Sequence, residues 1–253
     1  MLSLSVNNSL VIFNNYRPLS NSPGNLSINP SPYIPATPNS PQKQKQQLYL
    51  HRSFRPPPSP LPSKFASLDI PSKLHVLACR LGLWYEYTPL IPSLLQEGIS
   101  PTSIEEETGI SIIEQNRLVV AAQVRDSLLQ SNTDQQIIAA FDIGGEQLLY
   151  EIRLLSATQR ASAAQFIVEN KLDVNGAQEL ARSIKDFPSR KDEKGRENFD
   201  YTLPGDCLAF MYYRQSREHN RNSFQRNAAL EQALSVAQTE KAKSAILEEL
   251  KEG

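Results

Sequence analysis

Apolar residues recur every three or four positions along most of the chain between residues 70 and 250, which is the period of an amphipathic helix. Strict alternation of apolar and polar residues, the pattern of a half-buried strand, is almost absent from the same region. The pattern therefore predicts an all-α fold. The helix ends can then be located from capping residues, prolines and glycines.

The first part, residues 68–130, is predicted to be helix-turn-helix-like. Pro71 suits the first turn of a helix, where its missing N–H costs nothing. That helix should run to about Tyr87, with apolar positions at Leu74, Leu77, Ala78, Leu81 and Trp84. A turn at Pro89 follows, and the next short helix should end at Gly98 in a left-handed conformation.

Capping residues define the helix pair that completes this part. Ser100 precedes a proline, the usual order at a helix start, and Gly109 is placed to end this short acidic helix. Ser111 and Glu114 have the spacing of a capping box, in which each side chain bonds a backbone N–H at the start of the next helix. We expect that next helix to reach about Gln130.

The remaining residues, 131–253, are predicted to form a helical extension. A cap at Thr133 or Asp134 should start a short helix, and the pair Gly144 and Gly145 should break the chain after it. Two further helices are expected from apolar positions at helical spacing, the first with Leu148, Leu149, Ile152 and Leu155 and the second with Ala163, Ala164, Phe166, Ile167 and Val168.

The extension should continue with a helix that Asp173 opens and that ends before residue 188. Residues 188–203 are rich in charge and have no apolar period, so we expect a solvated, mobile loop. Helix should resume at Pro204. A polar interval near residues 219–222 is expected to bend or interrupt it, and one long helix should then run to the end of the chain.

The amino-terminal segment has a different composition. Residues 1–68 contain none of the 27 acidic residues but 12 of the 18 prolines, among many Ser, Asn and Gln. Such a segment cannot bury enough apolar surface to offset the entropy of ordering it. A basic, hydroxyl-rich stretch without acids is typical of a chloroplast transit peptide. We therefore assign residues 1–67 to a disordered transit peptide and linker, with a disordered tail without an address as the alternative.

Charge and cysteine content narrow the class of the remaining body. From Asp69 onward the chain has 20 basic and 27 acidic residues, a formal net charge of −7, which argues against nucleic acid as a partner. No apolar run is long enough to span a bilayer, so we expect no membrane partner. The two cysteines, Cys79 and Cys207, are too few for a disulfide framework and fit a reducing compartment.

The predicted helix pair around Gly109 offers one alternative function. Its spacing is that of a helix-turn-helix, whose second helix can enter the major groove of DNA. The first helix carries three glutamates, however, and the second has only Arg117 and Arg125 as cations. A structural helix pair is therefore favoured, and an organellar nucleic-acid-binding protein is the runner-up.

A metal or catalytic site has little support in the sequence. His75 and Cys79 are four residues apart and could place two zinc ligands on one helix face, but two ligands do not make a site. A partly buried His and a buried Cys are the simpler interpretation. No nucleophile motif or phosphate-binding loop is present, so we expect no cofactor, no metal and no enzymatic activity, with a metalloenzyme as a weaker alternative.

The richest polar cluster lies at residues 212–221. If helical geometry persists there, an aromatic and three arginines share one face: Phe210, Arg214, Arg217 and Arg221. Arg and Tyr are enriched at the energetic centres of protein interfaces, which makes this face a candidate protein-binding surface. Two simpler possibilities stay open: the arginines pair with the protein's own carboxylates, and Tyr213 or Phe210 belongs to the core.

Two runs of sequence carry a family resemblance. The run FDIGGEQLLYEIRLLSATQRASAAQFIVENKLD at residues 141–173 and the run LPGDCLAFMYYRQSRE at residues 203–218 resemble the amino-terminal α-domain of the Rubisco accumulation factor 1 family of plants and cyanobacteria. The likeness covers roughly residues 68–249. It implies a helix-turn-helix part followed by a helical extension, in agreement with the predicted helices.

The resemblance also implies a function and a location. It implies a chaperone of the chloroplast stroma in photosynthetic carbon fixation that binds folded Rubisco large subunits after their release from the chaperonin. Such a chaperone holds the large subunits as antiparallel dimers, helps to build the octameric core and leaves when small subunits dock. On this basis we expect four residues to contact the large subunit, the arginines through bidentate bonds to carboxylates: Tyr213, Arg214, Arg217 and Arg221.

One departure from the family concerns the carboxy terminus. Family members continue through a flexible linker into a β-domain that dimerises, whereas this sequence stops at Gly253. Without that half, a bivalent protein loses the gain in effective concentration that the second contact provides. We therefore expect this form to be a monomer with residual affinity for large subunits.

Overall fold

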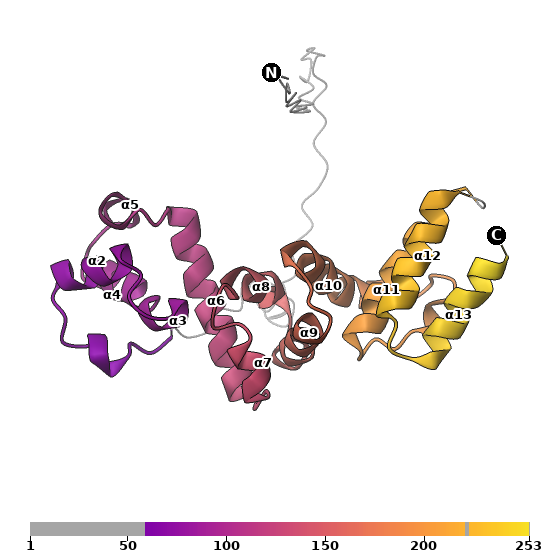
Figure 1. Ribbon diagram of the computed structural model, residues 1–253, viewed down its shortest axis with the longest axis horizontal. Helices are drawn as coiled ribbons and strands as arrows, with labels where there is room; N and C mark the ends of the chain where they lie inside the picture. Colours follow the sequence, from indigo (N-terminus) through magenta and orange to yellow (C-terminus); the bar gives the residue numbers. More distant parts are fainter. Residues whose placement is uncertain (1–58, 221–222, 253) are drawn as a thin grey trace, which may run out of the picture. The chain divides into compact units, whose positions relative to one another are not determined.

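The computed structural model describes residues 59–220 and 223–252 (Figure 1). Within these residues all of the assigned secondary-structure elements are helices, and none is a strand. The predicted all-α fold is therefore confirmed for this part of the chain. The transit-peptide prediction falls almost wholly on residues 1–58, outside the described residues. The packed structure begins ahead of residue 68, because Phe65 of the short 3-10 helix η1 (Ser63–Phe65) is buried in the core.

The first five α-helices build the helix-turn-helix part: α2 (Ile70–Ala78), α3 (Trp84–Tyr87), α4 (Leu90–Gln96), α5 (Pro101–Thr108) and α6 (Ile112–Gln130). The prediction of one helix to Tyr87 was wrong, since the chain leaves the helix after Ala78. Arg80 and Gly82 have φ values of 47° and 104°, a left-handed backbone that no α-helix continues through. Leu81, expected in the core, is 47% exposed as a result.

The capping residues act largely as predicted. The Ser100 hydroxyl accepts a hydrogen bond from the N–H of Ser103 at 3.0 Å, and Gly109 ends α5 with φ 69°. The Ser111 hydroxyl accepts from the N–H of Glu114 at 3.2 Å. The return half of that capping box does not form, because the Glu114 carboxylate instead forms an ion pair with Arg80. The sequence pattern thus assigned Glu114 to a local capping role, whereas the fold pairs its carboxylate with Arg80, a residue far away in the sequence.

The extension begins with four α-helices and a 3-10 turn: α7 (Gln135–Ala139), α8 (Glu146–Glu151), η2 (Ile152–Leu154), α9 (Ala157–Glu169) and α10 (Val174–Asp186). Asp134 caps α7 and Asp173 caps α10, each through a 2.8 Å hydrogen bond from a backbone N–H. Helix α6 packs against α8, and the Trp84 indole N–H donates to the carbonyl of Phe141 at 2.9 Å. These contacts join the extension to the helix-turn-helix part.

The segment after α10 is exposed over most of its length, as predicted, but it also contains residues that pack into the core. It contains the 3-10 helices η3 (Phe187–Ser189) and η4 (Arg196–Asn198), and Phe199 is 6% exposed. The Phe199 ring lies 5.2 Å from that of Phe210 and 5.3 Å from that of Tyr213. Phe199 therefore anchors the predicted loop at residues 188–203 to the core. Phe187 of η3 and Phe199 both pack against Phe210, and such isolated aromatic residues leave no period in the sequence.

The last three helices lie side by side: α11 (Pro204–Ser216), α12 (Phe224–Val236) and α13 (Glu240–Lys251) (Figure 1). Helix α11 stops at Ser216, in agreement with the interruption expected near residues 219–222. The single long helix predicted after that point was wrong. Helix α12 ends before Ala237, whose φ and ψ of −62° and 129° are not helical. Helix α13 then begins at Glu240.

Asp206 explains the position of that turn. Its side chain is fully buried, and its Oδ1 accepts hydrogen bonds from the backbone N–H groups of Gln238 at 2.8 Å and Thr239 at 3.0 Å. Its Oδ2 accepts from the Thr239 hydroxyl at 2.6 Å and from the N–H of Asp200 at 3.0 Å. One carboxylate thus fixes the start of α11, the segment before it and the turn between α12 and α13.

Candidate protein-binding surface

Helix α11 carries two of the four residues that the sequence singled out for protein binding, Tyr213 and Arg214. It ends at Ser216, and Arg217 is its C-cap residue, so the helical face expected from Phe210 to Arg221 is not continuous. Arg221 itself lies outside the described residues. Arg214 and Arg217 are partly exposed, with side-chain exposures of 19% and 28%. These two arginines are therefore the members of the predicted site that reach the surface of the described structure.

Tyr213 belongs to the core, as does Phe210, which is one of the two possibilities that the sequence left open. Tyr213 is 4% exposed, and its hydroxyl donates to Glu249 Oε2 at 3.2 Å. Burial raises the pKa of this phenol. The ring contacts Phe199 on one side and lies 4.3 Å from the guanidinium carbon of Arg217. Tyr213 thus holds the guanidinium group of Arg217 in position.

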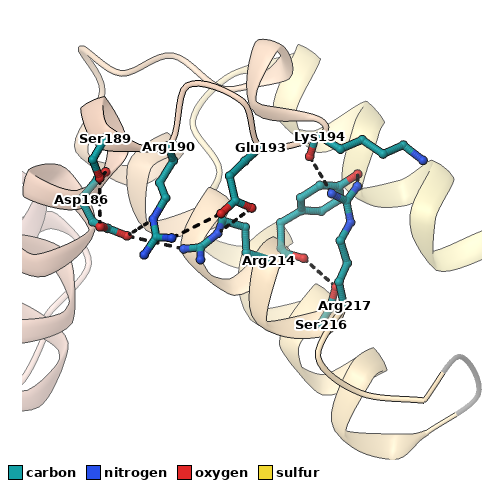
Figure 2. Close-up of polar contacts among 9 residues, drawn as sticks. Asp186, Ser189, Arg190, Glu193, Lys194, Arg214, Ser216 and Arg217 are labelled. Carbon is teal, nitrogen blue, oxygen red and sulfur yellow. Dashed lines mark hydrogen bonds and ion pairs between the residues drawn. The ribbon is translucent and has the colours of Figure 1, made fainter.

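Arg217 is held by three groups, and Figure 2 shows its contact with Lys194. Its Nη1 donates to the backbone carbonyl of Lys194 at 2.6 Å, and its Nη2 donates to the Tyr213 hydroxyl at 2.7 Å. The same Nη2 lies 3.6 Å from Glu249 Oε2. A guanidinium held in this way has lost its rotamer freedom before any partner arrives.

Arg214 is fixed together with Arg190, and we call these two residues the arginine pair. Figure 2 shows both guanidinium groups pointing into the space between Asp186 and Glu193. Asp186 Oδ2 lies 2.8 Å from Arg190 Nε and 3.5 Å from Arg214 Nη1. Glu193 lies 3.4 Å from Arg190 Nη1 and 3.1 Å from Arg214 Nε. The hydrogen bond from Arg190, assisted by nearby positive charge, lowers the pKa of Asp186, so this carboxylate is ionised at neutral pH.

The arginine pair was missed in part by sequence reasoning. Arg190, Asp186 and Glu193 were assigned to a helix end and a solvated loop, without a role at the site. The spacing of Asp186, Arg190 and Glu193 at steps of four and three was the available signal. The second simple possibility, that the arginines pair with the protein's own carboxylates, describes what Arg214 and Arg217 do.

A groove with a volume of about 650 Å³ lies beside the arginine pair, between η2, α10 and α11. Five cationic side chains line it: Arg153, Arg182, Lys185, Arg190 and Arg214. Three carboxylates line it as well: Glu151, Asp186 and Glu218. We call this feature the cationic groove. Its excess of positive charge contrasts with the net charge of −7 of the chain from Asp69 onward.

The other sequence candidates lie apart from this surface. His75 and Cys79 are both exposed, with Sγ 3.8 Å from Nδ1, rather than buried as the simpler interpretation expected. Across residues 59–220 and 223–252, no three His, Cys, Asp or Glu side chains gather as a metal site would require.

Cys207 is buried, and both cysteines are free thiols. Burial, followed by the charges of Asp206 and Asp200, raises the pKa of the Cys207 thiol to about 12, so this thiol is protonated at neutral pH.

The helix-turn-helix offers few cations for a nucleic acid. Arg125 of α6 lies 2.8 Å from Asp142, and its guanidinium carbon is 3.5 Å from the centre of the Tyr85 ring. At the start of α6 the exposed residues include Ile112 and Ile113, 45% and 74% exposed. This geometry gives the alternative function, an organellar nucleic-acid-binding protein, no added support.

In the described part of the chain, no helix combines the length and apolarity needed to cross a membrane.

The fold and this surface define a class of protein: an all-helical protein in which a helix-turn-helix part is followed by a helical extension. Two family models match the two parts. The Rubisco accumulation factor 1 helix turn helix domain matches residues 69–129, and the Rubisco accumulation factor 1 alpha helical domain matches residues 141–250. The chain belongs to the Rubisco accumulation factor 1 family.

Individual relatives support the same assignment. The chain is 58% identical over 238 residues to Rubisco accumulation factor 1.1, chloroplastic, of Arabidopsis thaliana, an overlap of 94% of this chain and 54% of that protein. It is 58% identical over 206 residues to Rubisco accumulation factor 1.2, chloroplastic, of the same plant, covering 81% and 45%. The rice protein Rubisco accumulation factor 1, chloroplastic, is 50% identical over 190 residues, covering 74% and 40%. The chain thus spans about half the length of the curated relatives it matches.

Proposed function

We propose that this chain is a Rubisco assembly chaperone that binds folded Rubisco large subunits and promotes assembly of the large-subunit dimer and the octameric core. The observation that carries the proposal is its 58% identity, over 94% of its length, to a relative named Rubisco accumulation factor 1.1, chloroplastic. The names of the relatives speak of Rubisco accumulation and of the chloroplast. Binding to the large subunit and the steps of assembly are our extension to this chain.

The location that we propose is the chloroplast stroma. Plant relatives carry the word chloroplastic in their names, and residues 1–68 of this chain contain no acidic residue. Basic, hydroxyl-rich leaders of this kind are typical of organellar import. A fusion of residues 1–68 to a fluorescent protein tests the proposal. Import into the stroma of isolated chloroplasts is expected, and retention of the fusion outside the organelle would contradict it.

The surface that we propose for the large subunit is centred on Arg214 and Arg217. Both guanidinium groups are partly exposed and held by internal partners, so binding costs little side-chain entropy. Each retains exposed area through which it can meet carboxylates of a partner. Tyr213 contributes by supporting Arg217 through the ring and hydroxyl contacts. Arg221 remains in the proposal as a residue outside the described structure.

Capture of large subunits by substituted chains tests this surface. Arg214→Gln and Arg217→Gln are preferred to charge reversals, because a carboxylate at either position would face Asp186, Glu193 or Glu249. We expect the double variant to bind large subunits about tenfold or more weakly, as loss of interface arginines commonly does. The matched control is Arg117→Gln on α6. Unchanged capture by a folded double variant would remove Arg214 and Arg217 from the interface.

The assembly function needs a separate test. Large subunits released from the chaperonin are incubated with and without the chain, and dimers and octameric cores are separated on native gels. Faster formation of these species is expected with the chain present. If the chain neither binds large subunits nor changes their assembly, the proposed function is wrong. Binding to duplex DNA that weakens steeply with salt would favour the nucleic-acid alternative instead.

A further inference from the structure

The cationic groove has a charge opposite to that of the body around it. Five cationic and three carboxylate side chains line it, whereas the chain from Asp69 onward has 20 basic and 27 acidic residues. Acidic proteins rarely gather cations in a concave site without cost, because like charges brought together repel one another. The local excess of positive charge therefore indicates a site for a negatively charged ligand.

The arginine pair gives one end of the groove a fixed geometry. Arg190 contacts Asp186 and Glu193 through Nε and Nη1, and Arg214 contacts the same two carboxylates through Nη1 and Nε. Each guanidinium carries five N–H donors, and its closest contacts with these carboxylates use only Nε and Nη1. Two guanidinium groups thus keep N–H donors for a ligand while their positions are set by the fold.

The groove also presents two cations that form no ion pair in the described part of the chain. Arg182 and Lys185 are exposed and lie three residues apart on α10, so they share one face of the helix. Neither forms an ion pair within residues 59–220 and 223–252. A ligand carboxylate can therefore pair with them without displacing a carboxylate of the described structure.

The groove also has apolar surface. Met211 and Ala181 line it, and Leu154 on η2 is 62% exposed at its edge. A flexible thioether adapts to apolar side chains of different shape. A ligand that combines carboxylates with an apolar side chain therefore matches both components of the lining, the cations and the apolar patch.

We infer that the cationic groove binds an acidic segment of the partner protein, with its carboxylates on Arg182, Lys185 and the arginine pair and an apolar side chain on Met211. This inference rests on the proposed function and specifies the chemistry of the partner's surface. A polynucleotide fits less well, because the body is acidic and Glu151 and Glu218 also line the groove. Those carboxylates would face an unbroken row of phosphates.

The test uses a short fluorescein-labelled peptide of repeated Glu-Asp-Leu units, and a second peptide in which Gln and Asn replace Glu and Asp. Binding to the full chain is measured by fluorescence anisotropy. The reversal variant is Arg182→Glu with Lys185→Glu, two exposed positions that form no ion pair in the part of the chain that the structure describes. The control is Arg117→Glu with Lys251→Glu, which makes the same change in net charge away from the groove.

We expect the acidic peptide to bind the full chain about tenfold or more tightly than the amide peptide. The groove reversal should remove that preference and weaken capture of large subunits, while the control variant stays within about twofold of the unsubstituted chain in both assays. Equal loss in both variants, or no loss in the groove reversal, would overturn the inference. Tighter binding of a single-stranded oligonucleotide than of the acidic peptide would also overturn it.

The two proposals fail in different ways. If the unsubstituted chain captures large subunits and the groove reversal captures them equally well, the groove inference is wrong and the proposed function stands. If the unsubstituted chain captures no large subunits, the proposed function is wrong. The anisotropy measurement then still decides whether the groove prefers an acidic segment.

Discussion

The helix pair α5 and α6 and the three-helix group α11, α12 and α13 are fixed in different ways. The ends of α5 and α6 are set by serines that bond a backbone N–H three residues ahead. The turn between α12 and α13 is set by Asp206, which lies 32 and 33 positions before the N–H groups that it binds. Helix ends of the first kind can be predicted from neighbours in the sequence, and those of the second kind cannot.

The buried polar groups of the two regions differ in the same way. In the helix pair, Gln115 is the main buried polar side chain, and its amide donates to the carbonyls of Pro101 and Ile110 at 2.9 Å each. In the three-helix group, Asp206 and Arg226 are both buried and charged. Buried charges depend strongly on their partners, because their desolvation must be offset by hydrogen bonds. The three-helix group should therefore be the more sensitive of the two regions to single substitutions.

The largest effect is expected from Asp206→Ala. The substitution leaves three backbone N–H groups and one hydroxyl without their buried acceptor. We expect the free energy of unfolding to fall by about 3–5 kcal/mol, the range for breaking a buried charged network. Urea unfolding measures the loss. Hydrogen exchange should show that protection is lost first in α11, α12 and α13.

Asp200→Ala is the matched control for this prediction. Asp200 is exposed, and among the described residues its side chain accepts hydrogen bonds only from the N–H and hydroxyl of Thr202. A loss of about 1 kcal/mol or less is expected, because water can replace the hydrogen bonds of an exposed side chain. If Asp206→Ala were no more destabilising than Asp200→Ala, the distant hydrogen bonds would not be what holds the turn, and the contrast between the two regions would fail.

The two regions also mark how far the sequence could predict the fold. Ser100, Gly109 and Asp173 fixed helix ends correctly because the atoms they bond lie within one helical turn. The break after Ala78 and the turn at Ala237 were missed, since apolar residues continue at helical spacing through both. In the second case the deciding group, Asp206, lies on another helix. The packing of residues 188–203 depends on Phe199, which a periodic pattern cannot reveal.

The candidate site shows the same limit. The cluster at residues 212–221 drew attention through its composition, and Arg214 and Arg217 do reach the surface. Their orientation depends on Asp186, Glu193 and Glu249, which come from three other segments. Whether an arginine faces a partner or the protein's own carboxylates is decided by this packing. Residue type alone could therefore suggest the surface but not its geometry.

An intermediate effect is expected from Ser111→Ala in the helix pair. The substitution removes one hydrogen bond to the N–H of Glu114 at the start of α6. We expect a loss of about 1 kcal/mol, typical of an N-cap serine, with exchange protection reduced only in the first turn of α6. Hydrogen exchange resolved along the chain measures this. Loss of protection that spreads into α11 would show that the two regions are not held independently.

The smallest effect is a pH dependence in the three-helix group. Burial alone would raise the pKa of Glu249, but hydrogen bonds from Arg226 and Tyr213 and the charge of Arg217 outweigh it and lower the pKa from its ordinary value of 4.5. A lowered carboxylate pKa contributes stability that is complete above that value and is lost as pH falls through the folded-state pKa. The difference in unfolding free energy between the unsubstituted chain and Glu249→Gln should therefore shrink as pH falls below 4.5.

Arg226 supplies the control for that pH dependence. It is 3% exposed, and its Nη2 donates to Glu249 Oε1 at 3.1 Å and to the Glu249 carbonyl at 2.7 Å. In an Arg226→Met background, the effect of Glu249→Gln should vary less with pH, because the strongest stabilising hydrogen bond to the carboxylate is gone. Unfolding measured from neutral to acid pH gives both differences. If the effect of Glu249→Gln stayed constant across this range, distant ion pairs would contribute no pH-dependent stability to the three-helix group. Buried hydrogen bonds such as those of Asp206 would then be the feature that distinguishes the three-helix group from the helix pair.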